Sequence, residues 1–337
     1  MQKINVAIIG ASGYTGLELI KSLIQHPHFK ITYIATTEGD IKATQLHPSL
    51  VGVFEQDVYK VDAQEVAKQA RLAFLALPHK TAMGFAKELL ALGVKVVDLS
   101  ADYRLELEAY EKHYGGHEDK ENLKEAIYGL PELNREKIKE AYLVANPGCY
   151  PTASLLGLLP FLGYLNKDAP IFIDAKSGVS GAGKKPSTTA HFVTINENMF
   201  AYNPLKHRHE PEIAEKIRLA SGYAHEVNFV PQLLPITRGM LVSSYIQTRE
   251  VIDAQAVLNT FYAKEYFVRV REVPVDIKSV AGTNFCDIFV AQKGKSIFIS
   301  SAIDNLLRGA SSQAIVNANL MCGLDEQAGI PTIAYVP

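Results

Sequence analysis

The sequence predicts an α/β protein with two domains, the first built on a parallel sheet with helices on both faces. Three observations support this prediction. Short apolar runs alternate with helical patterns through the first half of the chain, and a glycine-rich turn follows the first of those runs. Beyond Cys149 the strand-like segments become longer and more polar at alternate positions, which favours an α+β domain with a mixed or antiparallel sheet.

The first-half elements follow from hydrophobic periodicity. Continuous apolar runs predict buried strands, and apolar residues at helical spacing predict the helices that cover them. We expect strands over residues 4–9, 31–35, 72–77 and 94–98, and helices over residues 16–25 and 82–92.

The second half contains fewer helical patterns between its strands. We expect strands over residues 171–175, 241–247, 285–291 and 296–302, and a final helix over residues 310–320 that packs back on the first domain. The predicted domains are therefore residues 1–148 together with 310–337, and residues 149–309.

Composition narrows the classes of protein. The chain has 337 residues, 47% of them hydrophobic, which is enough for two cores, and its net charge of -2 lacks the basic surplus of a nucleic-acid binder. The longest apolar runs, such as residues 155–165, are too short to span a membrane, and the first residues lack the pattern of a signal peptide, so we expect a cytoplasmic protein. Three widely spaced cysteines without a CxxC pattern predict neither disulfides nor a metal site.

A glycine-rich turn separates the first predicted strand from the first predicted helix. Glycine allows the backbone to approach a ligand closely, and a helix N-terminus offers unpaired amides and a favourable dipole to an anion. This position predicts a dinucleotide site in a Rossmann-type domain, although a plain strand-to-helix turn would look similar. The expected contacts are Gly10, Ser12, Gly13, Tyr14, Thr15 and Gly16.

The end of the second predicted strand bears on the choice of dinucleotide. Thr36 and Thr37 stand where many NAD sites carry an acidic residue, and hydroxyl groups tolerate a 2′-phosphate better. Because Glu38 follows closely, this segment favours NADP(H) without excluding NAD.

Cys149 lies on a tight turn just ahead of an apolar, helix-like run. Pro147 and Gly148 end a short apolar strand, and Pro151 suits the first turn of a helix. A helix N-terminus favours the thiolate, which is the nucleophilic form. Taken alone, Cys149 is either a nucleophile or a buried small hydrophobe.

Two histidines are candidates for acid–base work beside such a thiolate. His207 and His209 flank Arg208, and Pro211 marks a predicted helix start. One imidazole could stabilise the thiolate and later protonate an oxyanion. A solvated helix cap is the alternative interpretation, and the sequence slightly favours His209 over His207 as the acid or base.

The chain resembles the N-acetyl-gamma-glutamyl-phosphate reductase family along essentially its whole length. The similarity is carried by the nucleophile signature across residues 144–160 and by further motifs in the same order, at residues 10–16, 74–79, 98–104, 128–132, 207–209, 235–239 and 304–310. Arg308 departs from the pattern, in which lysine is more usual, and no arginine stands near Thr36.

The resemblance implies a two-domain enzyme of arginine biosynthesis that uses NADPH, with a catalytic and dimerisation domain after the Rossmann-type domain. Cys149 would attack the gamma-acyl phosphate, release phosphate and form a thioacyl enzyme, which NADPH reduces to the semialdehyde. The resemblance also implies a homo-oligomer, either a dimer or a tetramer.

Further residues complete the expected sites. Arg104 and Arg238 lie in turn-like motifs and are candidates for the phosphate or the substrate carboxylate, although surface ion pairs would look alike. A small-residue loop after residue 175 suits close approach of backbone to ligand. The additional cofactor candidates are Leu77, Pro78, His79, Ser100, Ser177, Gly178 and Asn305, and the substrate candidates are Arg104, Asn146, Arg238, Ser180 and Gly181.

Other functions stay open at this level. A reductase of the same plan could act on aspartyl or aminoadipyl phosphate. A nucleotide-sensing regulator without turnover and a cysteine hydrolase without hydride transfer belong to different classes. The intact cysteine and histidine motifs argue against the regulator, and the glycine-rich turn argues against the hydrolase.

Overall fold

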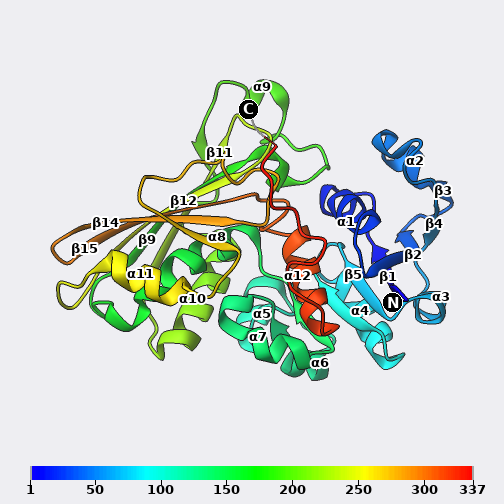
Figure 1. Ribbon diagram of the computed structural model, residues 1–337, viewed down its shortest axis with the longest axis horizontal. Coiled ribbons are helices and arrows are strands. Elements are labelled where there is room, and N and C mark those ends of the chain that lie inside the picture. Colours follow the sequence, from blue (N-terminus) through cyan, green and yellow to red (C-terminus); the bar gives the residue numbers. More distant parts are fainter. Residues whose placement is uncertain (1, 336–337) are drawn as a thin grey trace. The chain divides into compact units, whose positions relative to one another are not determined.

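The computed structural model describes residues 2–335 and divides into two compact units (Figure 1). The first unit comprises the described residues up to Pro147 together with Ala310–Pro331, and the second comprises Gly148–Gly309 with the described residues from Thr332 onward. No helix within residues 2–335 is long and apolar enough to cross a membrane.

The sheet of the first unit is almost entirely parallel. Within the described residues it has eight strands in the order β3-β4-β2-β1-β5-β6-β8-β7, and only the β3–β4 pair is antiparallel. This arrangement confirms the predicted Rossmann-type parallel sheet. The strands are β1 (Ile4–Ile9), β2 (Phe29–Thr36), β3 (Ile41–Lys42), β4 (Asp57–Lys60), β5 (Leu72–Leu75), β6 (Lys95–Asp98), β7 (Ile127–Tyr128) and β8 (Leu143–Ala145).

Helices accompany these strands because parallel neighbours need crossover connections. They are α1 (Tyr14–Ile24), α2 (Ala43–Leu46), α3 (Ala63–Gln69), α4 (Thr81–Ala91), α5 (Leu107–Tyr114), α6 (Lys120–Glu125), α7 (Pro131–Glu140) and α12 (Ser311–Met321), with a 3-10 turn at Pro48–Leu50.

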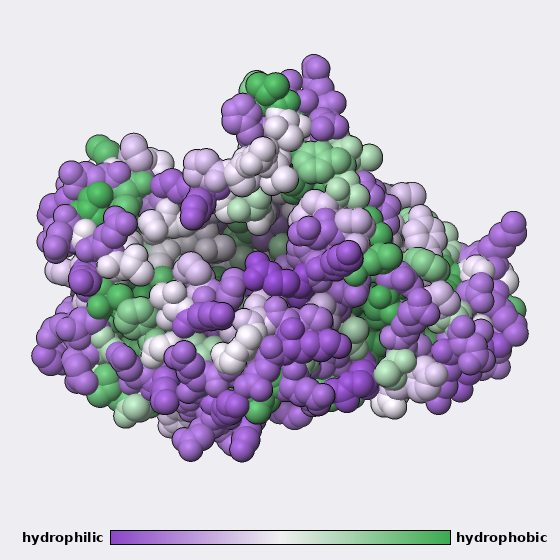
Figure 2. All heavy atoms as spheres, turned by 180° about the vertical axis from the view of Figure 1, so that it is seen from behind, coloured by the Kyte–Doolittle hydropathy of each residue, from purple (hydrophilic) through white to green (hydrophobic). Residues whose placement is uncertain are grey.

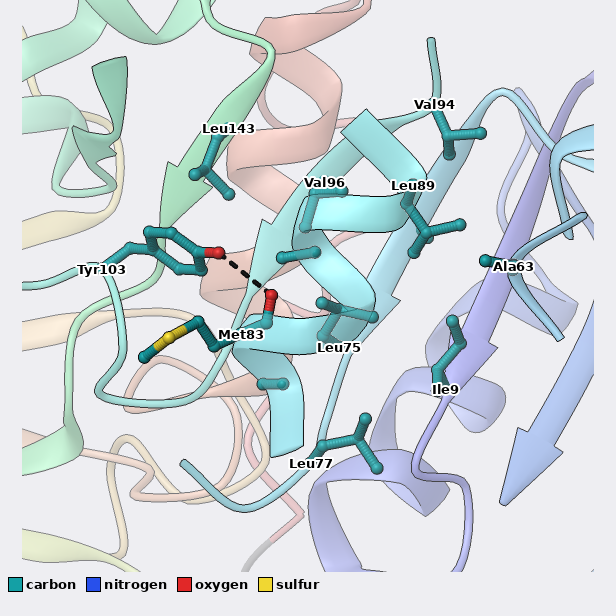
Figure 3. Packing of buried hydrophobic residues seen from close by; sticks show 14 of the residues in the cluster. Ile9, Ala63, Leu75, Leu77, Met83, Leu89, Val94, Val96, Tyr103 and Leu143 are labelled. Carbon is teal, nitrogen blue, oxygen red and sulfur yellow. Dashed lines mark hydrogen bonds between the residues drawn. The ribbon is translucent and has the colours of Figure 1, made fainter. Parts of the chain in front are cut away.

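A buried apolar cluster joins α3 and α4 to one face of this sheet. Ile9, Leu75 and Val96 contribute side chains from three strands, and Met83 and Leu89 contribute from α4 (Figure 3). At the edge of the cluster, the Tyr103 hydroxyl donates to the carbonyl of Met83 at 3.3 Å. Full burial of each such aliphatic side chain stabilises the fold by roughly 1.5–3 kcal/mol.

Helix α12 belongs to the first unit although it lies near the end of the chain. The Ser311 hydroxyl donates to the carbonyl of Thr15 at 2.9 Å, and the Asn317 amide donates to the carbonyl of Gly129 at 2.9 Å. The sequence prediction grouped residues 310–337 as one piece, whereas the described residues from Thr332 onward group with the second unit.

The second unit contains a mixed sheet, as the sequence predicts. Its strands, among the described residues, run in the order β10-β11-β9-β12-β15-β14-β13, with parallel pairs at β9–β11 and β13–β14 and antiparallel pairs elsewhere. They are β9 (Ile171–Gly178), β10 (Phe200–Ala201), β11 (Val227–Leu234), β12 (Met240–Gln247), β13 (Val268–Arg271), β14 (Cys286–Lys293) and β15 (Ser296–Ile303).

Helices cover one face of this sheet. Figure 1 shows α8 (Cys149–Leu158), α10 (His209–Ser221) and α11 (Ala254–Tyr262) on the same side of the strands. Shorter helical turns are α9 (Phe192–Ile195), Leu159–Tyr164 and Val179–Ala182. Figure 2 shows hydrophobic side chains gathered at the α9 end of this unit, where Phe192 and Val193 are 72% and 77% exposed.

Several element boundaries differ from those predicted. Strand β5 ends at Leu75 instead of residue 77, and Ala76, whose N–H donates to the Ile9 carbonyl, begins the loop that leads to Pro78. Helix α1 begins at Tyr14, and α10 begins at His209, two residues before Pro211. Strand β11 was not predicted, because Pro231 interrupts its apolar pattern; the strand tolerates this proline beside the two-residue β10.

Candidate active site

Cys149 is the first residue of helix α8. The sequence placed it just ahead of the helix, whereas the structure makes Gly148 the N-cap, with φ -68° and ψ 158°, and Cys149 the first helical residue. The N-cap Gly148 has no side chain that could cap the terminus, and Cys149 is partly exposed although Gly148 and Tyr150 on either side are buried. The helix dipole and the amides of the first turn therefore act directly on the thiol.

Aromatic rings gather around the residue that follows the cysteine. The Tyr150 ring lies 5.7 Å from the His207 ring and 5.9 Å from the His209 ring, both edge-on, and 5.3 Å from Phe229. The Tyr202 hydroxyl donates to the Tyr150 hydroxyl at 3.0 Å. The structure thus brings both predicted histidines to the helix start that carries Cys149, within one unit.

The two imidazoles differ in their surroundings. His207 and His209 lie 4.9 Å apart between ring centroids, and the His207 Nδ1 accepts the backbone N–H of His209 at 3.1 Å. Burial, aided by the neighbouring Arg208 charge, lowers the pKa of His207 to about 4. His207 is therefore neutral near pH 7 and is protonated on Nε2, because its Nδ1 serves as an acceptor.

The segment after β15 borders the cysteine. A Cβ added at Gly309 would lie 2.6 Å from the Cys149 Cβ and 2.6 Å from the Asn305 carbonyl oxygen, so only glycine fits. The Asn305 amide donates to the Ser180 hydroxyl at 3.0 Å and accepts the Gly239 N–H at 2.6 Å. Asn305 thereby links the small-residue loop to the turn that carries Arg238.

Arg238 is held by a buried carboxylate in that turn. Its Nε donates to Asp304 Oδ2 at 2.6 Å, and Asp304 is fully buried, also accepting the N–H groups of Gly282, Leu306 and Leu307. An added Cβ at Gly178 would lie 2.8 Å from the Arg238 backbone nitrogen. The loop with Ser177, Gly178, Ser180 and Gly181 therefore packs closely on the Arg238 turn.

The glycine-rich turn in the first unit fits a dinucleotide. Gly10 has φ +93°, and a Cβ there would lie 2.3 Å from the Ala76 carbonyl oxygen. Gly16 packs so closely on Gly10 and Ala11 that an added Cβ would lie 2.6 Å from a backbone oxygen. Gly13 is the N-cap of α1, without a side-chain cap, and an added Cβ there would meet only the Thr15 hydroxyl, at 4.0 Å. These are the tight turn, close packing and open amide terminus that a pyrophosphate requires.

The other predicted cofactor residues in the first unit surround strand ends. Thr36 is buried, and its hydroxyl accepts the Gly39 N–H at 2.9 Å, whereas Thr37 is exposed. Leu77, Pro78 and His79 form the loop between β5 and α4, with Leu77 buried and Pro78 exposed. Ser12 and Tyr14 are exposed on the glycine turn, and Thr15 is half-buried.

A buried polar network holds the segment after β6. The Ser100 hydroxyl donates to Asp98 at 2.7 Å, and burial together with the nearby Asp102 charge raises the pKa of Asp98 to about 7. Arg104 is 7% exposed and donates to the carbonyls of Leu99 and Asn146, each at 2.8 Å. These contacts position the ends of β6 and β8.

Asn146 is fully buried at the end of β8. Its amide donates to the Ala310 carbonyl at 3.1 Å, and its oxygen accepts from the Asn317 amide at 3.0 Å. Of the predicted substrate residues, Arg104 and Asn146 thus belong to the first unit, and Arg238, Ser180 and Gly181 belong to the second unit with Cys149.

Three residues that the structure places in this site could not be assigned a role from the sequence. Glu212 accepts the Gly148 N–H, Asp304 holds Arg238, and Gly309 borders Cys149. Asp304 and Gly309 lie within a motif that carries the family resemblance, and Glu212 lies three residues after another such motif, but a motif does not show which neighbour each residue contacts. Within residues 2–335, no group of three or more histidine, cysteine, aspartate or glutamate side chains could hold a metal ion.

Comparison with known families defines the class. Residues 5–141 match the family described as "Semialdehyde dehydrogenase, NAD binding domain", and residues 149–305 match "Semialdehyde dehydrogenase, dimerisation domain". The fold is similar to aspartate semialdehyde dehydrogenase II from Vibrio cholerae, with a TM-score of 0.74 at 18% identity over 96% of this chain and 99% of that chain. The two-unit chain is a semialdehyde dehydrogenase by class, and its first unit is an NAD-binding domain.

Curated relatives identify the family within this class. The chain is 63% identical to N-acetyl-gamma-glutamyl-phosphate reductase from a Sulfurovum species, over 99% of this chain and 100% of that protein. It is 61% identical to the reductase of the same name from Wolinella succinogenes, over the full length of both. The chain belongs to the N-acetyl-gamma-glutamyl-phosphate reductase family, which confirms the resemblance drawn from its motifs.

Proposed function

We propose that this protein reduces N-acetyl-L-glutamyl 5-phosphate to N-acetyl-L-glutamate 5-semialdehyde and phosphate, as a step of arginine biosynthesis in the cytoplasm. The observation that carries the proposal is the placement of Cys149 at the N-terminus of helix α8 beside the Tyr150, His207 and His209 rings. The names of the close relatives support the choice of substrate.

Cys149 is the nucleophile in this mechanism. Its thiolate attacks the acyl carbon, forming a C–S bond, and the bond from that carbon to the phosphate oxygen breaks. The dinucleotide, when bound, supplies the hydride that reduces the resulting thioester. The tetrahedral oxyanion then collapses to the aldehyde and returns the electron pair to the Cys149 sulfur, so that one demanding step is divided into two.

His209 is the proposed acid and base. It supplies the proton that the departing phosphate takes up, and backbone amides at the start of α8 stabilise the oxyanion. His207 is neutral, because its pKa is about 4, and its Nδ1 is committed to the His209 backbone. We therefore assign His207 a positioning role.

Arg238 is the proposed partner of a substrate anion in the second unit. Asp304 fixes the guanidinium through Nε, and an arginine fixed in this way offers planar donors to phosphate or carboxylate. Ser180 and Gly181 would contribute through the adjacent loop. Arg104 and Asn146 remain predictions, as do the cofactor contacts of Ser100, Ser177, Gly178 and Asn305.

NADP(H) is the proposed dinucleotide. Strand β2 ends in threonine, and the exposed Thr37 places a hydroxyl, without an acidic side chain of its own, at the position where NAD sites carry a carboxylate. Comparison of kcat/KM for NADPH and NADH tests this preference.

The uncovered sheet face of the second unit is the proposed interface between copies of the chain. Phe172 and Tyr245 are paired across β9 and β12 and are 51% and 50% exposed, and Phe298 lies 5.3 Å from Tyr245 between ring centroids. These rings line a groove of about 610 Å³. We propose a homo-oligomer, a dimer or a tetramer, built through this face.

A coupled assay tests the reaction. The purified protein should oxidise NADPH with N-acetyl-glutamyl phosphate, and should reduce NADP with the semialdehyde plus phosphate. Turnover with aspartyl or aminoadipyl phosphate in its place would identify a rival reductase. Light scattering on the native protein and on a Phe172→Lys/Tyr245→Lys variant tests the interface, since loss of a larger species only in the variant is the expected result.

A further inference from the structure

A buried carboxylate joins the start of α10 to the turn that carries the nucleophile. The N–H of Gly148 donates to Glu212 Oε1 at 3.1 Å, and Glu212 is 1% exposed. Gly148 is the N-cap of α8, immediately before Cys149. Any movement of the Glu212 carboxylate therefore acts on the backbone from which the Cys149 side chain extends.

Glu212 also lies on the histidine side of the site. It stands in the first turn of α10, three residues after His209, and residues at this spacing share one face of a helix. The same turn carries a second carboxylate, Glu210, which accepts the Phe229 N–H of β11 at 3.3 Å. The two carboxylates of this turn thus accept hydrogen bonds from different elements. Glu210 accepts from β11, and Glu212 accepts from the residue before Cys149.

Physical chemistry gives this contact two effects. A buried carboxylate requires strong hydrogen bonds, so its contact with Gly148 holds the backbone of the N-cap in one conformation. Its negative charge favours a protonated imidazole on the same helix face and opposes a charged thiolate without that imidazole. Both effects favour a thiolate that is paired with His209 over an isolated thiolate.

We propose that Glu212 is a positioning residue that fixes the Cys149 turn against the His209 turn and maintains the proton on His209. This inference rests on the proposed roles of Cys149 and His209. Glu212 needs no contact with the substrate. Besides Cys149, His209 and Glu212 themselves, the charged and titratable residues of the elements packed there include Tyr150, Tyr202, His207, Arg208, Glu210, Glu215 and Lys216.

Three variants separate the two effects. Glu212→Gln preserves an oxygen that can accept the Gly148 N–H but removes the charge, and Glu212→Ala removes both. Glu210→Gln is the matched control, because it neutralises a carboxylate in the same turn whose partner is β11. Each intact variant is assayed for kcat and KM and for the rate of Cys149 alkylation by iodoacetamide across pH 5–10.

Glu212→Gln should lower kcat about tenfold with KM nearly unchanged, and should shift the alkylation profile by about one pH unit, as expected for loss of one nearby charge. Glu212→Ala should lower kcat about 100-fold, the scale of a small misplacement of a catalytic group. Glu210→Gln should change kcat and the alkylation profile much less than Glu212→Gln does, because its carboxylate bonds to β11 and not to the Cys149 turn. Glu212→Gln preserves volume, so it decides the test even where Glu212→Ala does not fold.

The inference is overturned if Glu212→Gln matches Glu210→Gln in both kcat and alkylation profile. Failure of the proposed function has a different signature, since the native protein would then lack turnover with the acyl phosphate. The alkylation profile still reports on Glu212 in that case, because it requires no substrate.

Discussion

The Nδ1 atom of His207 accepts the backbone N–H of His209 at 3.1 Å, so one imidazole holds the backbone that carries the other. This relationship separates two residues that look equivalent along the chain. His207 is half-buried and neutral, and we assign its side chain to positioning, which leaves His209 as the proposed acid and base.

The first prediction concerns this pair. His209→Asn should lower kcat by about 100- to 10,000-fold, the usual contribution of general acid–base catalysis. His207→Asn should lower kcat by about tenfold, because it disturbs only the position of His209. Steady-state assays of both variants at saturating substrate provide the measurement, and equal losses would contradict the assignment.

The pH profile gives a second prediction. The pKa of His207 is about 4, below its usual value of 6.5, so its neutral form stabilises the fold above pH 6.5 and this contribution is lost as pH falls from 6.5 through 4. Any acidic limb of kcat between pH 6 and 7 should therefore persist in His207→Asn. Its disappearance from that variant would show that His207 itself titrates there.

The third prediction concerns the nucleophile. Cys149→Ala should abolish hydride transfer, because no thioester can form, while the dinucleotide affinity measured by fluorescence titration stays close to native. Retained turnover would exclude covalent catalysis through Cys149.

Gly309 offers a fourth, steric prediction. Gly309→Ala adds a Cβ that must lie 2.6 Å from the Cys149 Cβ and from the Asn305 oxygen, so the cysteine must move. We expect kcat to fall about 100-fold. Gly163→Ala is the control, since an added Cβ there meets nothing within 4 Å. Equal activity in the two variants would show that the 304–309 segment can move away without consequence.

The last prediction concerns stability. His26 is fully buried, and its Nδ1 accepts the N–H groups of His28 and Phe29 while its Nε2 lies 2.7 Å from the Ala328 carbonyl oxygen. Burial lowers its pKa to about 4. Because the pKa is lower in the folded state than in the unfolded state, stability should fall by about 1–3 kcal/mol as pH decreases from 6.5 to 4.

Thermal unfolding at pH 7.5 and 4.5 measures this effect. His26→Gln should be less stable at pH 7.5 and should lose less stability on acidification than the native protein. His28→Gln, at the half-buried neighbour, should retain most of the native pH dependence, because burial is the largest cause of the low pKa of His26 and the His28 charge a smaller one. An unchanged pH dependence in His26→Gln would assign the acid sensitivity to other groups.

Much of the fold could be predicted, because many of its strands follow from local patterns of apolar residues. The strand at residues 4–9 matches β1, and the strands predicted around β12, β14 and β15 begin and end within one or two residues of the observed bounds. Each is a continuous or alternating apolar run, which depends only on neighbouring residues. Strand β11 could not be predicted, because its Pro231 is tolerated only next to the short strand β10. The order of strands in a sheet cannot be deduced from the local sequence.

The features of the candidate site can likewise be separated into those that the sequence predicts and those that it does not. Residue types and their spacing were enough to predict the turn at Cys149, the glycine turn at residues 10–16 and the family to which the chain belongs. The three-dimensional structure was needed to show which groups meet: Glu212 with Gly148, Asp304 with Arg238, and Gly309 with Cys149. Each pair joins residues more than 60 positions apart, and long-range packing in three dimensions, which no local pattern encodes, brings them together.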